Sequence, residues 1–473
     1  MIYLCGTIMI ALLGFVSTMV LTRILSQKVY AMYGLLVTFV SAVDMFIAMG
    51  YDQAYMRFYY AHDRSAGRFL WECMKVPLMM FLVFAVVFLE PGQRLIQFVF
   101  AERLTWIAVC AVLAKVFLSN AHRFGQLIAR MSESAGNYVI SNIISKSGFL
   151  GIVLILSLVI GDISFAWIGI SFAITAALAT AINLAAFRRI YHRKNPEGKR
   201  IAGMDLLKYG FPYMINNVLV LLIPILEKII IRNLAGWEVL SIFTAASIFQ
   251  TVVLLVLNTI TNIWNPLVFK HCEDEKTFKP IIHTFGLVTT LVLTCVTSAC
   301  ILLRRWLVLL LDEKYFTVYV IAPTIMVAAC FNILAAIYAV GINIRKKTIH
   351  LVVAPIIQII ISMGLCYLLI PSLGLIGVGI AILASIATAR GYRIMVGLHY
   401  YDTGVKETKV LVVCILCAVA TVASMFFTSL AHDVLISVTL FALTCLIINK
   451  DILTVTKYII TLVKPTPKRE KHN

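Results

Sequence analysis

A few ionisable side chains lie inside long apolar stretches of this 473-residue sequence. Lys115 and Lys146 have no acidic residue within one helical turn, and Asp44 is the only charged residue between positions 30 and 50. A charge at the centre of a membrane-spanning helix costs about 2.5–3.5 kcal/mol on insertion scales, so such groups usually face a cavity or a partner. Lysines at this depth favour an anionic ligand such as a phosphate. The carboxylate suits either an ion pair with one of the lysines or a coupling cation.

Other charged residues lie near the ends of predicted spans. Arg23 and Arg57 occupy positions where arginine commonly extends to the membrane surface, so a site role and a structural role both stay open. Glu227 and Lys228 are neighbours that form either a local ion pair or part of a polar helix face. The structural alternative for such buried polar groups is interhelical bonding, worth about 0.6 kcal/mol per contact.

The composition identifies the elements that must position these groups. Apolar residues make up 61% of the chain and charged residues 13%, against roughly 45–50% and about 25% in soluble proteins. Too few polar residues are present to cover soluble domains, which excludes a soluble enzyme, a secreted disulfide-linked domain and a disordered chain. The formal net charge of +18 is typical of basic cytoplasmic loops, and nucleic acid is not expected as a partner.

Apolar runs of about 20 residues predict membrane-spanning helices and an all-α polytopic membrane protein. The first run lacks a basic leader and a cleavage site, so we expect a retained helix and not a signal peptide. Cys414 and Cys417 form a C-x-x-C without a basic neighbour, and we interpret them as packing residues and expect no metal site. About fourteen spans are predicted, near residues 2–22, 30–50, 74–89, 104–121, 138–160, 165–187, 209–231, 239–263, 281–303, 317–341, 349–370, 373–397, 409–429 and 433–449.

Lysine and arginine alternate along the chain in a way that predicts its orientation. Loops after even-numbered spans and the C-terminal tail are rich in these residues, whereas loops after odd-numbered spans are poor in them. Because basic loops stay in the cytoplasm, we expect an even number of spans and both termini in the cytoplasm. The loops are too short to fold as domains, so recognition must take place within the helices or at their ends.

An internal repeat divides the predicted spans into two halves. Arg23 after the first span is matched by Arg232 after the seventh, and Arg57 after the second is matched by Lys270 after the eighth. This repeat predicts two six-helix lobes of parallel topology. In transporters, such an arrangement places the substrate between the lobes. The predicted parts are an N-terminal lobe, a basic cytoplasmic linker, a C-terminal lobe, and two C-terminal helices with a basic cytoplasmic tail, at residues 1–187, 188–208, 209–401 and 402–473.

Short motifs at the ends of several predicted spans carry a resemblance to a known family. They are LTRILS at 21–26, YGLL at 33–36, GYDQAYMRFY at 50–59, YGFP at 209–212, Glu227-Lys228, and Asn265-Pro266. Together they resemble the bacterial polysaccharide flippases of the O-antigen (Wzx) type, which belong to the MATE-like MOP superfamily. Glu227-Lys228 departs from the family's usual Asp-Arg, which keeps both charges but loses the guanidinium fork that binds phosphate bidentately.

The resemblance implies a transporter, not an enzyme, in the bacterial cytoplasmic (inner) membrane. It implies export of an undecaprenyl-diphosphate-linked oligosaccharide for O-antigen, lipopolysaccharide, capsule or exopolysaccharide biosynthesis, by alternating access of the two lobes. It further implies a proton or sodium gradient as the energy source, no cofactor, and as partners the lipid-linked glycan, membrane lipids, and a polysaccharide polymerase with its chain-length machinery. Carried over by position, Arg23, Arg57 and Lys228 match basic sites of the family's motifs, and Asp52 matches an acidic one.

The candidate site therefore combines groups from the sequence pattern and from the resemblance. Candidates for binding an anionic head group are Arg23, Arg57, Lys115, Lys146 and Lys228. Candidates for ion coupling or ion pairing are Asp44, Asp52 and Glu227.

Three other functions stay open. A MATE-type multidrug antiporter has the same architecture, but cationic drugs more often require acidic groups in the cavity. A flippase for the peptidoglycan precursor is a second alternative. A polysaccharide polymerase or ligase is the enzymatic alternative, and it resembles chains with one large external loop, which this sequence lacks. The sequence also lacks a Walker A motif, a dinucleotide-binding motif and a zinc-protease motif.

Overall fold

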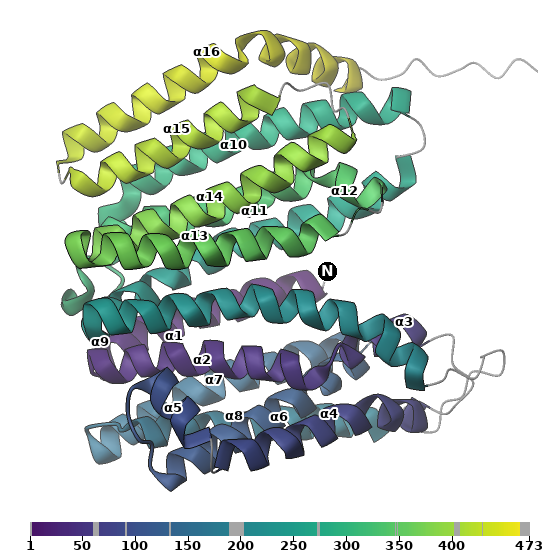
Figure 1. Ribbon diagram of the computed structural model, residues 1–473, viewed down its shortest axis with the longest axis vertical. Helices are drawn as coiled ribbons and strands as arrows, with labels where there is room; N and C mark the ends of the chain where they lie inside the picture. The colour runs from purple at the N-terminus through teal and green to yellow at the C-terminus, as the bar shows by residue number, and fades with distance from the viewer. Residues whose placement is uncertain are drawn as a thin grey trace, which may run out of the picture. The chain divides into compact units, whose positions relative to one another are not determined.

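The computed structural model describes residues 2–59, 66–89, 92–131, 134–188, 203–271, 275–345, 347, 349–401, 407–427 and 429–463, and this part of the chain is built of helices (Figure 1). Most of the predicted linker, residues 189–202, and the tail from residue 464 lie outside the described residues. The helices are α1 (Ile2–Ile24), α2 (Gln27–Ala48), α3 (Tyr51–Phe58), α4 (Ala66–Leu89), α5 (Gly92–Phe100), α6 (Trp106–Met131), α7 (Ala135–Ile160), α8 (Phe165–Arg188), α9 (Gly203–His271), α10 (Glu275–Val308), η1 (Glu313–Tyr315), α11 (Val318–Tyr338), α12 (Val340–Ile344), α13 (Ile349–Leu373), α14 (Leu375–Tyr400), α15 (Glu407–Phe426) and α16 (Leu430–Val463).

The prediction of a polytopic all-α membrane protein is confirmed. Twelve helices of the described residues are long and apolar enough to cross a membrane. One of them, Gly203–Leu254, is 52 residues long and contains two predicted spans, which are separated where Gly236 takes a non-helical backbone conformation (φ 82°, ψ −178°). With that division and the shorter apolar helix Ile8–Ile24, the segments correspond to the fourteen that the sequence predicts.

The long apolar runs are helical because lipid offers the backbone no hydrogen-bond partners. Proline lies inside α4, α10 and α11, at Pro77, Pro280 and Pro323. Three short helices, α3, α5 and α12, were not predicted, because 5 to 9 residues carry too little periodic signal. The sequence also predicts an end near residue 121 for the span that becomes α6, whereas α6 continues to Met131.

The described chain divides into two compact units. Unit 1 contains Met1–Thr251, Val308–Val318 and Cys366–Gly374, and unit 2 contains Val252–Leu307, Tyr319–Leu365 and Leu375–Asn473. The division into two parallel six-helix lobes stays a prediction.

Within unit 1, α8 packs along both α6 and α7, and α7 packs along α1. Three aromatic rings from different helices stack in this bundle. The ring centres of Phe149 on α7 and Phe172 on α8 are 4.1 Å apart, and the ring centre of Tyr33 on α2 lies 5.7 Å from each of them. A second apolar cluster holds α3 in place through Tyr51, Tyr55 and their neighbours on α4 and α6. These clusters fix the helices around the polar groups described below.

A tight corner joins α2 to α3. Met49 and Gly50 both have positive φ, 49° and 73°, which ends α2 and starts α3 in a new direction. The corner lies against α9, because a Cβ atom on Gly50 would collide with the backbone oxygen of Gly210. Gly50 therefore meets two requirements that favour glycine, a left-handed conformation and a close backbone approach.

Within unit 2, α15 and α16 lie side by side, and α15 packs on α14 (Figure 1). Arg304 of α10 is fully buried and forms a bidentate ion pair with the equally buried Asp433 of α16, with Nε–Oδ2 and Nη2–Oδ1 distances of 3.0 and 2.8 Å. Its remaining N–H groups reach the carbonyl oxygens of Ser424 and Phe427 at the end of α15. One guanidinium therefore joins α10 to the connection between α15 and α16.

Candidate functional site

One face of α6 carries a row of polar side chains in unit 1. Lys115, Ser119, His122 and Gln126 follow one another at intervals of three or four residues, which places them on one side of the helix. Another face of α6 is buried and apolar, with residues such as Ala108, Val112 and Val116. The polar row therefore runs along a helix that is fixed by its packing against α8.

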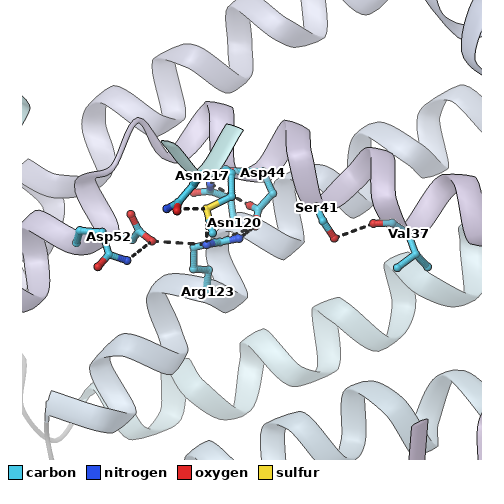
Figure 2. A network of polar contacts seen from close by, with 9 residues as sticks. Val37, Ser41, Asp44, Asp52, Asn120, Arg123 and Asn217 are labelled. Carbon is cyan, nitrogen blue, oxygen red and sulfur yellow. Dashed lines mark hydrogen bonds and ion pairs between the residues drawn. The ribbon is translucent and has the colours of Figure 1, made fainter. Parts of the chain in front are cut away.

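Arg123, next to this row, is the centre of an ion-pair network. Its Nε and Nη2 atoms lie 2.9 and 2.5 Å from Oδ2 of Asp44 on α2, and its Nη1 lies 3.5 Å from Oδ2 of Asp52 on α3 (Figure 2). The side chains of Asp44 and Asp52 are only 6% and 5% exposed, whereas Arg123 is 23% exposed. The guanidinium thus links both sides of the α2–α3 corner to α6 while part of it stays accessible.

Amide side chains support this network. Asn120 Nδ2 donates to Oδ1 of Asp44 at 3.2 Å, so both carboxylate oxygens of Asp44 have partners. His122 lies between Gln126, 2.8 Å from its Nε2, and Asn183 of α8, 3.2 Å from its Nδ1. Gln126 also donates to Asn142 of α7 at 2.8 Å. These bonds hold the α6 side chains in fixed orientations.

The polar face of α6 borders a cavity of about 390 Å³ in unit 1. A second cavity of about 170 Å³ lies beside it, and both are lined by Asp44, Lys115, Ser119 and Arg123. The larger cavity is completed by Met45, Asp52, Gln53, Met56, His122, Gln126, Leu127, Arg130, Ser145 and Ala176. Cations and hydrogen-bond donors therefore converge on a partly open cavity between the spanning helices of unit 1.

Lys115 is one of two cations of this cavity that have no ion pair with a carboxylate among the described residues; the other, Arg130, is exposed and donates to the hydroxyl of Tyr138. The Nζ of Lys115 lies over the ring of Phe172, 4.8 Å from the ring centre. The ion pairs of the described residues leave it without a carboxylate partner, because Asp44 and Asp52 are both directed to Arg123. A half-buried ammonium group that faces a cavity and has no ion pair is ready to bind an anion. Among the described residues, no three or more histidine, cysteine, aspartate or glutamate side chains lie close enough together to hold a metal ion.

The structure brings together three of the eight predicted site residues. Asp44, Asp52 and Lys115 line the same cavity. Asp44 was expected to pair with Lys115 or Lys146 or to hold a coupling cation, but it pairs with Arg123. The guanidinium is the better partner here because two of its N–H groups, on Nε and Nη2, both donate to Oδ2 of the carboxylate.

The other five predicted residues lie apart from the cavities described above. Arg23 and Arg57 are exposed, at the ends of α1 and α3. Lys146 donates from Nζ to the carbonyl oxygen of Ile10 on α1 at 3.3 Å. Lys228 and Glu227 are buried in α9, and Lys228 donates to the carbonyl oxygen of Gly34 on α2 at 2.7 Å.

Sequence reasoning missed Arg123, the residue that organises the site. The prediction ended the span near residue 121 because the apolar run ends there, and Arg123 was assigned to a loop. The signal that identifies it is the polar row itself, which continues past the apolar run with helical spacing from Lys115 through Ser119 and His122 to Gln126. Unit 2 also contains a polar contact that was not predicted, between Arg390 Nε and Asn332 Oδ1 at 2.6 Å.

Comparison with solved structures shows a known fold. The chain is similar to the lipid II flippase MurJ in an inward closed conformation, with 14% identity, a TM-score of 0.66, and coverage of 95% of this chain and 99% of that one. It is also similar to an inward-facing multidrug resistance MATE transporter of the MOP superfamily, with 12% identity, a TM-score of 0.68, and coverage of 85% and 98%. A MATE transporter of Vibrio cholerae matches with 12% identity, a TM-score of 0.53, and coverage of 85% and 96%. At these identities the likeness shows the fold alone.

Sequence comparison identifies the family. The comparison with curated proteins gave no match. The family model described as "Polysaccharide biosynthesis protein" matches residues 1–272. This range includes α1 to α9 and every residue that lines the two cavities. Because this match covers more than half of the sequence, the chain belongs to the polysaccharide biosynthesis protein family.

Proposed function

We propose that this chain is a flippase that moves an undecaprenyl-diphosphate-linked oligosaccharide across the bacterial cytoplasmic membrane for surface polysaccharide biosynthesis. The single observation that carries the proposal is Lys115, a cation without a carboxylate partner in a cavity that it shares with Arg123. The family match and a fold similar to a lipid II flippase support the same class of function. The O-antigen class of glycan comes from the motif resemblance.

The cavity suits the head group of such a substrate. A diphosphate carries several negative charges, which Lys115 binds as a point charge and Arg123 binds through parallel N–H groups. Ser119, His122 and Gln126 lie on the same helix face and offer hydrogen bonds to phosphate or sugar oxygens. A volume of about 390 Å³ is at the small end for ligand pockets, so we assign it to the diphosphate region and not to the whole lipid-linked glycan.

The proposed cycle is alternating access of two lobes, driven by a proton or sodium gradient, in a chain with both termini in the cytoplasm. Fixed cations at membrane depth replace the water that the diphosphate loses on entry, which lowers the cost of taking its charge across the bilayer. The basic candidates Arg23, Arg57, Lys146 and Lys228 remain proposals for the path that leads to and from this cavity. A polysaccharide polymerase and its chain-length machinery are the proposed partners on the outer side.

The charges of the cavity favour this substrate over the cationic drugs of an antiporter. A cationic drug requires a carboxylate that is free to pair with it. Both carboxylates in the cavity contact Arg123 instead, and the charged groups without an ion pair among the described residues, Lys115 and Arg130, are cations. The cavity therefore supports an anionic ligand.

Depletion of the chain in its native bacterium tests the proposed function. We expect an undecaprenyl-diphosphate-linked oligosaccharide to accumulate, and mass spectrometry of the extracted lipids identifies its glycan. Re-expression of the wild-type chain is the control and should restore the lipid pool. Accumulation of the peptidoglycan precursor instead would assign the chain to that substrate, and an unchanged lipid pool with new drug sensitivity would contradict the flippase proposal in favour of a drug antiporter.

A further inference from the structure

We propose that Asp52 is a built-in counterion of Arg123, which an incoming phosphate group displaces, and that it thereby sets the affinity of the cavity for diphosphates. The inference rests on the proposed function, since it concerns the same cavity. It assigns to Asp52 a positioning role that differs from the ion coupling expected for it.

The two carboxylates hold Arg123 with unequal strength. Asp44 accepts two N–H groups of Arg123 at 2.9 and 2.5 Å, and Asn120 fixes its other oxygen at 3.2 Å (Figure 2). Asp52 makes one contact, at 3.5 Å from Nη1, which is long for a charge-assisted hydrogen bond. Asp44 therefore orients the guanidinium, while Asp52 is the partner that is easier to replace.

Asp52 is placed so that the loss of its contact with Arg123 costs little free energy. Gln53 Nε2 donates to its Oδ2 at 3.1 Å, so the carboxylate keeps a partner when Arg123 turns to a ligand. Asp52 also lies in the first turn of α3, where the free N–H groups of a helix favour negative charge. Arg123 is the more exposed member of the pair, and both residues line the larger cavity.

The exchange is local to side chains. Tyr51 and Tyr55 anchor α3 in a buried aromatic cluster that includes Phe69 of α4 and Phe124 of α6. The α2–α3 corner also lies against α9 at Gly50 and Gly210. We therefore expect α3 to stay in place while the Asp52 carboxylate loses its contact with Nη1 of Arg123.

A displaceable carboxylate lowers the affinity of the cavity for every anion that binds Arg123. Each anion must outcompete Asp52, and a second contact with a cation offsets the loss of the internal ion pair. Lys115 lines the same cavity two helical turns from Arg123, so a diphosphate that contacts both cations gains this second contact. The preference for a diphosphate then comes from Lys115, whereas Asp52 sets the affinity.

Calorimetric titration of the purified full-length chain with inorganic pyrophosphate and with orthophosphate tests the inference. We expect Asp52→Asn to bind pyrophosphate about tenfold more tightly than the wild-type chain. The gain for orthophosphate should be similar, because both anions displace Asp52 from the same guanidinium. Asp205→Asn is the matched control, because it removes one negative charge from an exposed position in the first turn of α9. Its affinity should equal that of the wild type.

A double-mutant cycle locates the effect at Arg123. Arg123→Gln should weaken pyrophosphate binding, and Asp52→Asn should add no affinity in that background. Equal or weaker binding by Asp52→Asn, or a gain that persists without Arg123, overturns the inference while wild-type binding leaves the proposed anion site intact. If neither the wild type nor Asp52→Asn binds pyrophosphate, both proposals fail.

A second substitution at the same position tests the inference if the Asp52→Asn variant does not fold. Asp52→Ser should also raise affinity, with size-exclusion chromatography as the check on folding. If the chain folds with neither substitution, Asp52 has a structural role and the inference is wrong.

Discussion

Cells whose only copy of this chain carries Lys115→Gln are expected to lose about 100-fold in glycan export. The substitution keeps much of the side-chain stem but removes a cavity cation that has no ion pair with a described carboxylate. A diphosphate entering the cavity then loses its charge-assisted contact with Nζ and keeps Arg123, which Asp44 already holds, and the exposed Arg130. Export is measured as the rate at which the surface glycan appears after induction of the variant.

Lys146→Gln is the matched comparison for this result. Lys146 is also a lysine within a spanning helix, but its Nζ donates to the carbonyl oxygen of Ile10. It lines neither of the cavities described in unit 1. We expect Lys146→Gln to retain a much larger share of export at equal expression. Normal export by a well-expressed Lys115→Gln variant would contradict the assignment of the cavity as the head-group site.

Removal of either partner of the Arg304–Asp433 pair is expected to cost about 3–5 kcal/mol of stability. Both side chains are fully buried, so Arg304→Gln leaves a carboxylate without its ion pair and Asp433→Asn leaves a guanidinium without it. The loss should loosen the connection between α15 and α16, whose carbonyl groups also contact Arg304. Thermal unfolding of the purified variants in detergent measures the effect as a lowered Tm.

Arg305→Gln is the control for the stability experiment. It removes the same charge at the neighbouring position of α10, where Arg305 is partly exposed and has no ion pair among the described residues. We expect its Tm to stay close to that of the wild type. The double variant Arg304→Met with Asp433→Leu should be more stable than either single variant, because it leaves no buried charge unpaired. Equal Tm values for all four variants would show that the pair does not stabilise unit 2.

The spanning helices were predictable because one physical requirement dominates them. A segment that crosses lipid must be apolar over about 20 residues and must satisfy its own backbone. The predicted starts and ends of α7, α8 and α13 therefore lie within a few residues of the observed ones. The break at Gly236 agrees with the predicted boundary between two spans, because its non-helical backbone conformation separates two helices.

The candidate site was only partly predictable, because its geometry depends on contacts between distant segments. Hydropathy identified Asp44 and Lys115 as costly charges, but it ended the helix before Arg123 and so hid the partner of Asp44. Residues 44, 52 and 123 meet only after α2, α3 and α6 are packed together, and this packing follows from the corner at Gly50 and the aromatic cluster around Tyr55. Arg304 and Asp433 are 129 residues apart, and no local pattern connects them.

Translocation by the purified chain in proteoliposomes tests the central claim most directly. The vesicles contain a fluorescent polyprenyl-diphosphate-linked oligosaccharide, and a membrane-impermeant quencher added outside measures how much of it has crossed. The account predicts that the wild-type chain moves the lipid when a proton or sodium gradient is applied, and that Lys115→Gln does so at about one hundredth of the rate. Transfer no faster than in protein-free vesicles under either gradient, or equal transfer by Lys115→Gln, would contradict it.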